Sequence, residues 1–107
     1  MPIDELQQEV DKWIKKYGVR YFNELTNMAI LSEEVGEVAR IISRKHGEQS
    51  SKESEISNLG EELSDVLFVI ICLANQSNIN LQAEFDKKMK IRSQRDNLRH
   101  KKNQKLF

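Results

Sequence analysis

Carboxylates interrupt the apolar pattern of two stretches of the sequence, residues 31–37 and 60–66, which read LSEEVGE and GEELSDV. At about 100° per residue on a helix, Glu34 falls on the apolar stripe of the first segment and Glu62 on that of the second. A carboxylate that faces a core is unfavourable by several kcal/mol unless a cation accompanies it. The two segments therefore predict a site that holds either buried basic side chains or a metal ion.

A divalent metal is the interpretation that the surrounding residues favour. Glu37 and Asp65 lie at the edges of the two stripes, so four carboxylates can converge between two helices. The basic residues Arg40, Arg44 and Lys45 lie on the other side of the first of these helices. An all-oxygen set suits Mg²⁺, with Mn²⁺ as the second candidate, and its predicted ligands are Glu34, Glu37, Glu62 and Asp65.

These acids require helices to position them, and the composition favours an all-α protein. The chain has 107 residues, enough for one domain, and contains only four Gly and one Pro. The apolar and turn patterns predict a four-helix-bundle-type fold, with helices over residues 3–17, 24–45, 55–76 and 81 to beyond 95. A polar loop is expected over residues 47–54. We expect the folded domain to cover residues 1–98 and a basic tail to follow over residues 99–107.

Several single residues predict where these helices begin and end and where they pack closely. Asn23 is predicted to cap the second helix, and Gly18 to end the first. Gly36 stands in the middle of the second helix, where Gly is about 1 kcal/mol less favourable than Ala, so a neighbouring helix or a ligand is expected to approach it closely. Cys72 is the only cysteine and is predicted to be a small core residue.

The third helix is apolar on all sides over Val66 to Ala74, a run of nine residues. A small bundle can bury such a helix on every face only by associating with copies of itself, so a homodimer or homotetramer is expected. Nine residues are far fewer than the ~20 of a membrane span. The chain also opens with acidic residues rather than with a signal peptide. A cytoplasmic protein that does not bind membranes is therefore expected.

Charge is unevenly distributed although the formal net charge is zero. Residues 1–65 hold 14 of the 17 acids against eight bases, and residues 86–107 hold nine bases against two acids. Lys88, Arg92 and Arg95 share one face of the fourth helix, which is either a solvated face or, opposite a metal site, a phosphate-binding one. No nucleic-acid partner is expected, because the basic tail has no interleaved aromatic residues.

The two acidic stretches and their context resemble the MazG-like, all-α nucleoside triphosphate pyrophosphohydrolases of the short single-domain bacterial type. Glu34-x-x-Glu37 is followed 25 residues later by Glu62-x-x-Asp65. The likeness covers roughly residues 5–96 and includes three further stretches: Tyr21-Phe22, Arg44-Lys-His-Gly-Glu48 and Cys-Leu-Ala-Asn75. It implies an oligomeric helical bundle that cleaves (deoxy)nucleoside triphosphates between the α- and β-phosphates, giving a monophosphate and pyrophosphate.

The resemblance also implies roles for individual residues. The four predicted ligands would hold Mg²⁺, and Glu33 would match the carboxylate that activates water in some relatives. Arg95 is the basic residue of the fourth helix that matches the relatives. Lys88 and Arg92 are added as phosphate contacts from helical geometry, because Ile91, Arg92 and Ser93 occupy a region where relatives tend to carry Lys or Asn.

Aromatic residues are the candidates for contact with a nucleobase. Trp13 and Tyr17 lie on the apolar stripe of the first helix, so the core is the plainer position for both, and Trp13 is also a candidate base contact. Tyr21 and Phe22 either join the first helix to the second or stack on the base. The base itself is left open: a general pool-cleaning enzyme, a dedicated dUTP or dCTP enzyme and a phosphoribosyl-ATP enzyme all fit.

Two other classes of protein share some of these features. A non-catalytic helical interaction module explains the apolar third helix, but it explains poorly why Glu34 and Glu62 lie within apolar stripes. A di-iron carboxylate bundle needs Glu-x-x-His pairs. Neither His46 nor His100 stands three residues after a Glu, which excludes that class.

Overall fold

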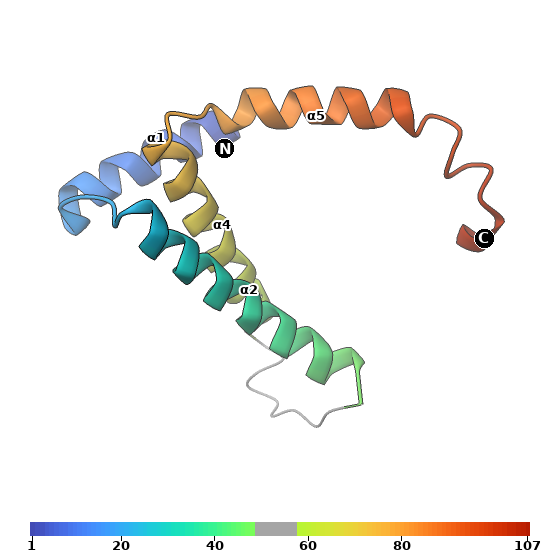
Figure 1. The fold of residues 1–107 in the computed structure, drawn as a ribbon, viewed down its shortest axis with the longest axis horizontal. Helices are drawn as coiled ribbons and strands as arrows, with labels where there is room; N and C mark the ends of the chain where they lie inside the picture. Colours follow the sequence, from blue (N-terminus) through green and yellow to red (C-terminus); the bar gives the residue numbers. More distant parts are fainter. Residues whose placement is uncertain (49–57) are drawn as a thin grey trace.

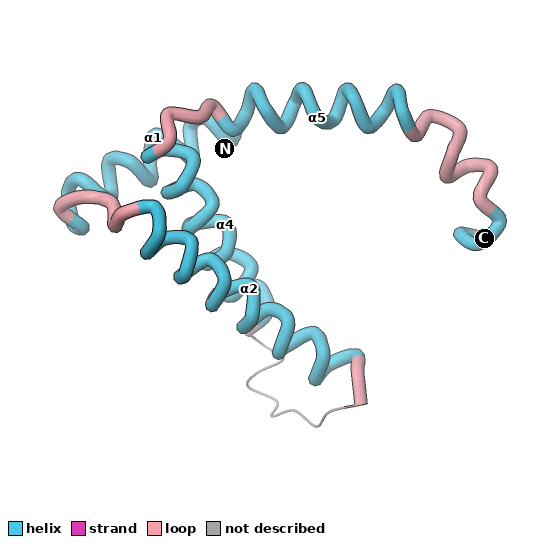
Figure 2. Tube along the Cα trace, viewed as in Figure 1, coloured by secondary structure: helices cyan, strands magenta, loops and turns pink. Residues whose placement is uncertain are grey.

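The computed structural model describes residues 1–48 and 58–107, and this part of the chain is all-helical (Figures 1 and 2). It contains four α-helices: α1 (Ile3–Trp13), α2 (Glu24–His46), α4 (Leu59–Gln76) and α5 (Leu81–Arg95). A π-helical turn over Ile14–Gly18 follows α1, and a 3₁₀ turn covers Gln104–Leu106. The predicted all-α fold is confirmed. The predicted start of the third helix at residue 55 and most of the expected polar loop lie outside the described residues.

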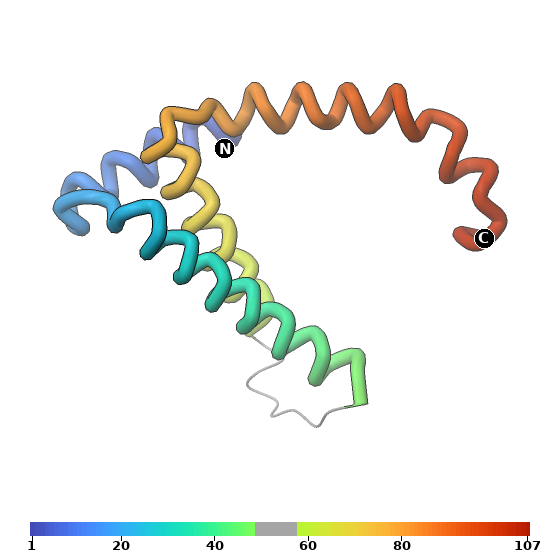
Figure 3. Tube along the Cα trace, viewed as in Figure 1, coloured from blue at the N-terminus to red at the C-terminus, as the bar shows by residue number. Residues whose placement is uncertain are grey.

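The helix pair α2 and α4 forms the main body of the chain. The two helices run antiparallel and make the most extensive contact between elements (Figure 3). α1 lies across the end of the pair where α4 finishes, and α5 leaves from this same end (Figure 1). The core lies where α1 and the π-helical turn meet α4, and its buried residues are Val10, Ile14, Ile71 and Cys72. The predicted core position of Cys72 is thereby confirmed.

Side chains and backbone strain both shape the ends of the helices. Oδ1 of Asn23 accepts a hydrogen bond from the backbone N–H of Thr26 at 2.8 Å, which confirms the predicted cap of α2. Gly18 is the last residue of the π-helical turn, yet it is Val19 that has a positive φ, of 70°. The N–H of Arg20 donates to the carbonyl of Gly18 at 2.8 Å, which closes a strained γ-turn around Val19.

Gln7 of α1 fixes the turn between α4 and α5. Its Nε2 donates to the carbonyl of Ile79 at 2.8 Å and to Oδ1 of Asn75 at 3.0 Å. Its Oε1 accepts from the backbone N–H of Leu81 at 2.9 Å, at the first residue of α5. Gln7 is buried, so these bonds compete little with water. One side chain therefore joins α1, the end of α4 and the start of α5.

The single chain is open rather than compact. Its radius of gyration is 17.5 Å, compared with about 13 Å for a compact domain of this length. α5 has no buried residue, and Leu63 and Leu67 of α4 are 51% and 45% exposed. One chain therefore does not bury the apolar run of α4 on every face. Among the described residues no single helix is long and apolar enough to cross a membrane, and α4 and α5 meet those criteria only as a pair bent by 108°.

Candidate functional site

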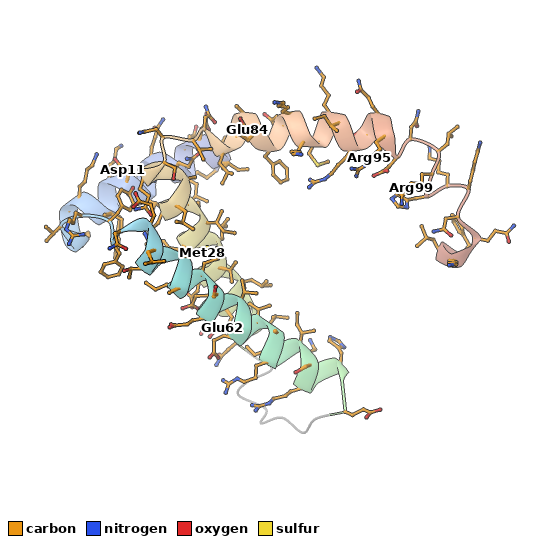
Figure 4. The ribbon with its side chains drawn as sticks, viewed as in Figure 1. Asp11, Met28, Glu62, Glu84, Arg95 and Arg99 are labelled. Carbon is orange, nitrogen blue, oxygen red and sulfur yellow. The ribbon has the colours of Figure 1, made fainter. Side chains whose placement is uncertain are left out.

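Three of the four predicted metal ligands converge between α2 and α4. One carboxylate oxygen from each of Glu34, Glu62 and Asp65 lies within 4.8 Å of the other two. Glu34 belongs to α2, and the other two acids lie one turn apart on α4, where the two helices run side by side (Figure 4). The antiparallel packing brings the acidic stretch of α2 opposite that of α4, as the two apolar stripes predicted.

The nearby carboxylates shift the pKa of Glu34, whose side chain is half-buried. Burial and then the charges of Asp65 and Glu62 raise the pKa of this carboxyl above its ordinary value of 4.5. A hydrogen bond with Glu62 and the charge of Glu37 raise it further. Carboxylates held this close repel one another unless a proton or a cation is shared among them, and an all-oxygen donor set fits a hard divalent ion.

Glu37 lies outside this group of three acids. Its Oε2 is 3.1 Å from Nη2 of Arg40, three residues further along α2. Arg40 is expected on the other side of α2, yet its side chain reaches Glu37 at the edge of the acidic stripe, because residues i and i+3 are neighbours on a helix. The two side chains of this ion pair are 46% and 48% exposed, so the pair contributes little stability and does not lock Glu37 in place.

Glu33 precedes Glu34 and points to a different side of α2. It is exposed, whereas Glu34 is half-buried, in agreement with a step of about 100° between successive residues of a helix. Its carboxylate is not part of the converging group of three acids. Glu33 is thus next to the acidic cluster in the chain and open to water.

A cavity of about 450 Å³ adjoins the acidic cluster. Its wall includes the three predicted base contacts and two of the predicted metal ligands: Trp13, Tyr21, Phe22, Glu34 and Asp65. Phe68 of α4 completes the aromatic lining and packs edge-on against Trp13, with ring centroids 5.8 Å apart. Flat apolar surfaces and acidic groups therefore share one cavity.

The aromatic residues of this cavity differ in what they leave free for a ligand. The hydroxyl of Tyr21 donates to Oδ1 of Asp11 at 2.6 Å and accepts from Nδ2 of Asn75 at 3.0 Å. Burial and then the bond to Asp11 raise the pKa of Tyr21 to about 12, so the hydroxyl is occupied and only the ring is available. Trp13 is 51% exposed and Tyr17 64% exposed, so the expected core position is wrong for both.

The predicted phosphate contacts Lys88, Arg92 and Arg95 lie on α5. In Figure 4, Arg95 stands at the far end of this helix, well away from Glu62. The guanidinium of Arg95 donates from Nε and Nη2 to the carboxylate of Asp96, at 3.1 and 3.0 Å. The single chain therefore does not bring these bases to the acidic cluster, because α5 leaves the α1 end of the molecule without packing on α2 or α4.

Sequence reasoning missed Asn27 of α2, which lines the cavity and is only 5% exposed. The signal was present, because Asn27 stands seven residues before Glu34 and so on the same stripe of the helix. The prediction for Gly36 is the opposite case, since among the described residues no other helix and no side chain beyond its chain neighbours lies within 4 Å of the place where its Cβ would stand. The close approach expected there does not occur within one chain.

Known proteins similar to this chain test the family resemblance that the two acidic stretches suggest. Residues 22–100 match the family model of the MazG nucleotide pyrophosphohydrolase domain. The chain is 41% identical over 93 residues to the uncharacterized protein YpjD of Bacillus subtilis (strain 168), which covers 86% of this chain and 84% of that protein.

Two solved structures share the fold. A crystal structure of YpjD from Bacillus subtilis has a TM-score of 0.74 and 39% identity, over 83% of this chain and 90% of that chain. The crystal structure of the Bacillus-conserved MazG protein, a nucleotide pyrophosphohydrolase, has a TM-score of 0.72 and 39% identity, over 84% and 87%. Sequence and fold agree, and the chain therefore belongs to the MazG nucleotide pyrophosphohydrolase family, which makes it a hydrolase rather than a non-catalytic interaction module.

Proposed function

We propose that this enzyme hydrolyses (deoxy)nucleoside triphosphates between the α- and β-phosphates in an Mg²⁺-dependent reaction that releases a monophosphate and pyrophosphate. The observation that carries this proposal is that the acidic cluster and the aromatic cavity share Glu34 and Asp65. A nucleotide is divided in the same way, into a flat base and a polyanionic chain. The base would lie between the rings, and the phosphates would lie toward the carboxylates, where a cation is needed.

The carboxylates of the cluster are the proposed metal ligands. Glu34, Glu62 and Asp65 would hold the ion, and Glu37 would become the fourth ligand by leaving its exposed pair with Arg40. Mg²⁺ is the first candidate and Mn²⁺ the second. A bound Mg²⁺ would neutralise charge on the phosphate oxygens.

Glu33 is proposed to accept the proton of the attacking water. It neighbours a ligand in the chain but points away from the converging acids, so its carboxylate stays available as a base. Its exposure gives water direct access to it. Glu33 is therefore the proposed base and Glu34 a proposed metal ligand, because the two side chains lie on different sides of one helix.

A second copy of the chain is proposed to complete the site. Exposed apolar residues on α2 and α4 need cover, and among them are Leu25, Met28, Val35, Leu63 and Leu67. A homodimer or homotetramer would bury them and account for the open shape of one chain. In such an assembly Lys88, Arg92 and Arg95 of one copy would bind the outer phosphates held at the acidic cluster of another.

Product analysis tests the reaction. The purified protein would be incubated with a panel of ribo- and deoxyribonucleoside triphosphates and with phosphoribosyl-ATP, in Mg²⁺ or in EDTA. We expect a monophosphate and pyrophosphate, formed only with metal. Release of a diphosphate and orthophosphate would contradict cleavage between the α- and β-phosphates. Turnover confined to dUTP, dCTP or phosphoribosyl-ATP would identify a dedicated enzyme rather than a general one.

A further inference from the structure

The amide of Asn27 has a fixed orientation. Its Nδ2 donates to the backbone carbonyl of Phe22 at 3.3 Å and to Oε1 of Gln76 at 2.8 Å. Nε2 of Gln76 donates to the same carbonyl at 2.8 Å. A backbone carbonyl can only accept hydrogen bonds, so the atoms that face it must be the two amide nitrogens. Both hydrogens of the Asn27 amide are therefore used inside the protein.

The oxygen of the Asn27 amide is left without a partner. Among the described residues no hydrogen bond is made to Oδ1, and no fully buried side-chain oxygen or nitrogen lacks a partner. Oδ1 must therefore touch open space, although the residue as a whole is only 5% exposed. The open space beside Asn27 includes the cavity of about 450 Å³ that the residue lines, which makes Oδ1 the hydrogen-bond acceptor that Asn27 can offer to a ligand there.

The position of Asn27 matches the far end of a bound nucleotide. Asn27 and Glu34 are two turns apart on one side of α2, which is roughly 10 Å along the helix axis. Both line the cavity, and the rings of Trp13 and Phe22 line it as well. A nucleotide with its phosphates toward Glu34 and its base between the rings would present the outer edge of the base to Asn27.

We propose that Asn27 reads the base by accepting a hydrogen bond from an exocyclic amine, so that the enzyme prefers cytosine and adenine nucleotides to their uracil and hypoxanthine counterparts. This inference rests on the proposed function. A carbonyl oxygen in place of the amine would set two acceptors against each other with no donor between them. The ring N–H of uracil could reach the same acceptor only if the base shifted in the cavity, because it lies one ring position away from the place that the amine of cytosine occupies.

The fixed amide explains why the preference cannot be reversed by a simple rotation. If the Asn27 amide flipped, its oxygen would face the carbonyl of Phe22 and Oε1 of Gln76, which are both acceptors. Gln76 cannot flip in compensation, because its own Nε2 is held by the Phe22 carbonyl. Gln76 is thus a positioning residue, and Asn27 is the residue that contacts the base.

Matched nucleotide pairs test this proposal. dCTP and dUTP differ by an amine in place of an oxygen, as do dATP and dITP. We expect kcat/KM to favour the amine of each pair by about tenfold or more. Trp13 is the only tryptophan and lines the cavity, so quenching of its fluorescence by dCMP and dUMP measures the same preference without turnover. If the unmodified enzyme shows equal kcat/KM values for the two nucleotides of each pair, or prefers the nucleotide with the oxygen, the proposal is overturned.

A pair of variants assigns the preference to the residue. Asn27→Leu is expected to bring both ratios close to one, and Asn97→Leu, the same change on the exposed C-terminal segment, should leave them unchanged. A preference that survives in Asn27→Leu would show that another group reads the base. If no nucleotide is turned over at all, the proposed function fails, while the Trp13 titration still decides whether Asn27 selects an amine.

Discussion

Glu34 and Asp65 hold carboxylate oxygens within 4.8 Å of each other across the interface between α2 and α4. Both residues also line the aromatic cavity, so they stand where the acidic cluster and the cavity join. Burial and the nearby charge of Asp65 raise the pKa of Glu34. The pair is therefore unfavourable in the free protein, and the binding of a cation would relieve it.

Glu62→Gln is expected to abolish Mg²⁺-dependent turnover. The substitution removes the charge of a proposed metal ligand, and it also removes repulsion against Glu34, so the helical fold should be as stable as before or more stable. Calorimetric titration with Mg²⁺, steady-state kinetics and thermal melting would measure the three effects. Glu61→Gln, an exposed neighbour on the same helix, is the matched control. Normal activity in Glu62→Gln would remove this residue from the site.

Glu33→Gln should slow turnover by about 100-fold or more while Mg²⁺ affinity is unchanged. The amide cannot accept a proton from water, but the three converging carboxylates are untouched by the change. Single-turnover rates and Mg²⁺ titrations of this variant, with Glu61→Gln again as control, separate the two properties. If Mg²⁺ binding is lost together with activity, Glu33 is a ligand rather than a base.

Without metal, Glu34 is expected to make the protein less stable as the pH rises. The folded pKa of this carboxyl is raised above 4.5, so at intermediate pH the folded state keeps a proton that the unfolded state releases. The free energy of unfolding should therefore fall as the pH increases from 4.5 to the folded pKa, and level off above it.

Glu34→Gln removes this titration, so its melting temperature should exceed that of the unmodified protein at neutral pH and converge with it in acid. Thermal melts in EDTA from about pH 4 to pH 7 would measure the difference. A difference that does not change with pH would contradict the raised pKa. Added Mg²⁺ should narrow the gap at neutral pH, because only the carboxylate form binds the ion well.

Gly36→Ala should raise the free energy of unfolding by about 1 kcal/mol. Apart from the adjacent residues and backbone of α2 itself, no described atom stands within 4 Å of the added Cβ, so alanine improves the helix without a clash. Gly47→Ala provides the contrast, because its Cβ would collide with the carbonyl of Ser43 and should destabilise the chain. Denaturant unfolding compares the two. If Gly36→Ala destabilises the protein, then a second copy or a ligand approaches this position, as the sequence suggested.

Hydrophobic periodicity is enough to predict the helices and the convergence of three of the four acids. Glu34 and Glu62 each replace an apolar residue on a stripe, and two stripes that pack together must bring such residues face to face. Asn27 obeys the same rule and could have been found by it. A polar residue two turns from Glu34 on one stripe is as anomalous as the carboxylate itself.

Periodicity could not predict features that depend on the route of the chain. Helical spacing places Lys88, Arg92 and Arg95 on one face of α5, but it does not give the direction of α5 relative to α2 and α4. The pair between Glu37 and Arg40 depends on flexible side chains. The γ-turn at Val19 contradicts the local preference of a β-branched residue, so only the three-dimensional structure reveals it.

Two side chains attach the start of α5 to α1: Gln7 makes three hydrogen bonds around the turn, and Oε1 of Gln82 accepts from the backbone N–H of Ile3 at 2.7 Å. The helix has 15 residues and no buried side chain of its own, so its direction depends mainly on these contacts at its start. It is about 22 Å long, and a rotation of about 10° at its start would move its far end by about 4 Å. Arg95 is the last residue of the helix and lies at that far end. A small rotation of α5 where it meets α1, beside the N-terminus of the chain, would thus displace Arg95 by more than the length of a hydrogen bond.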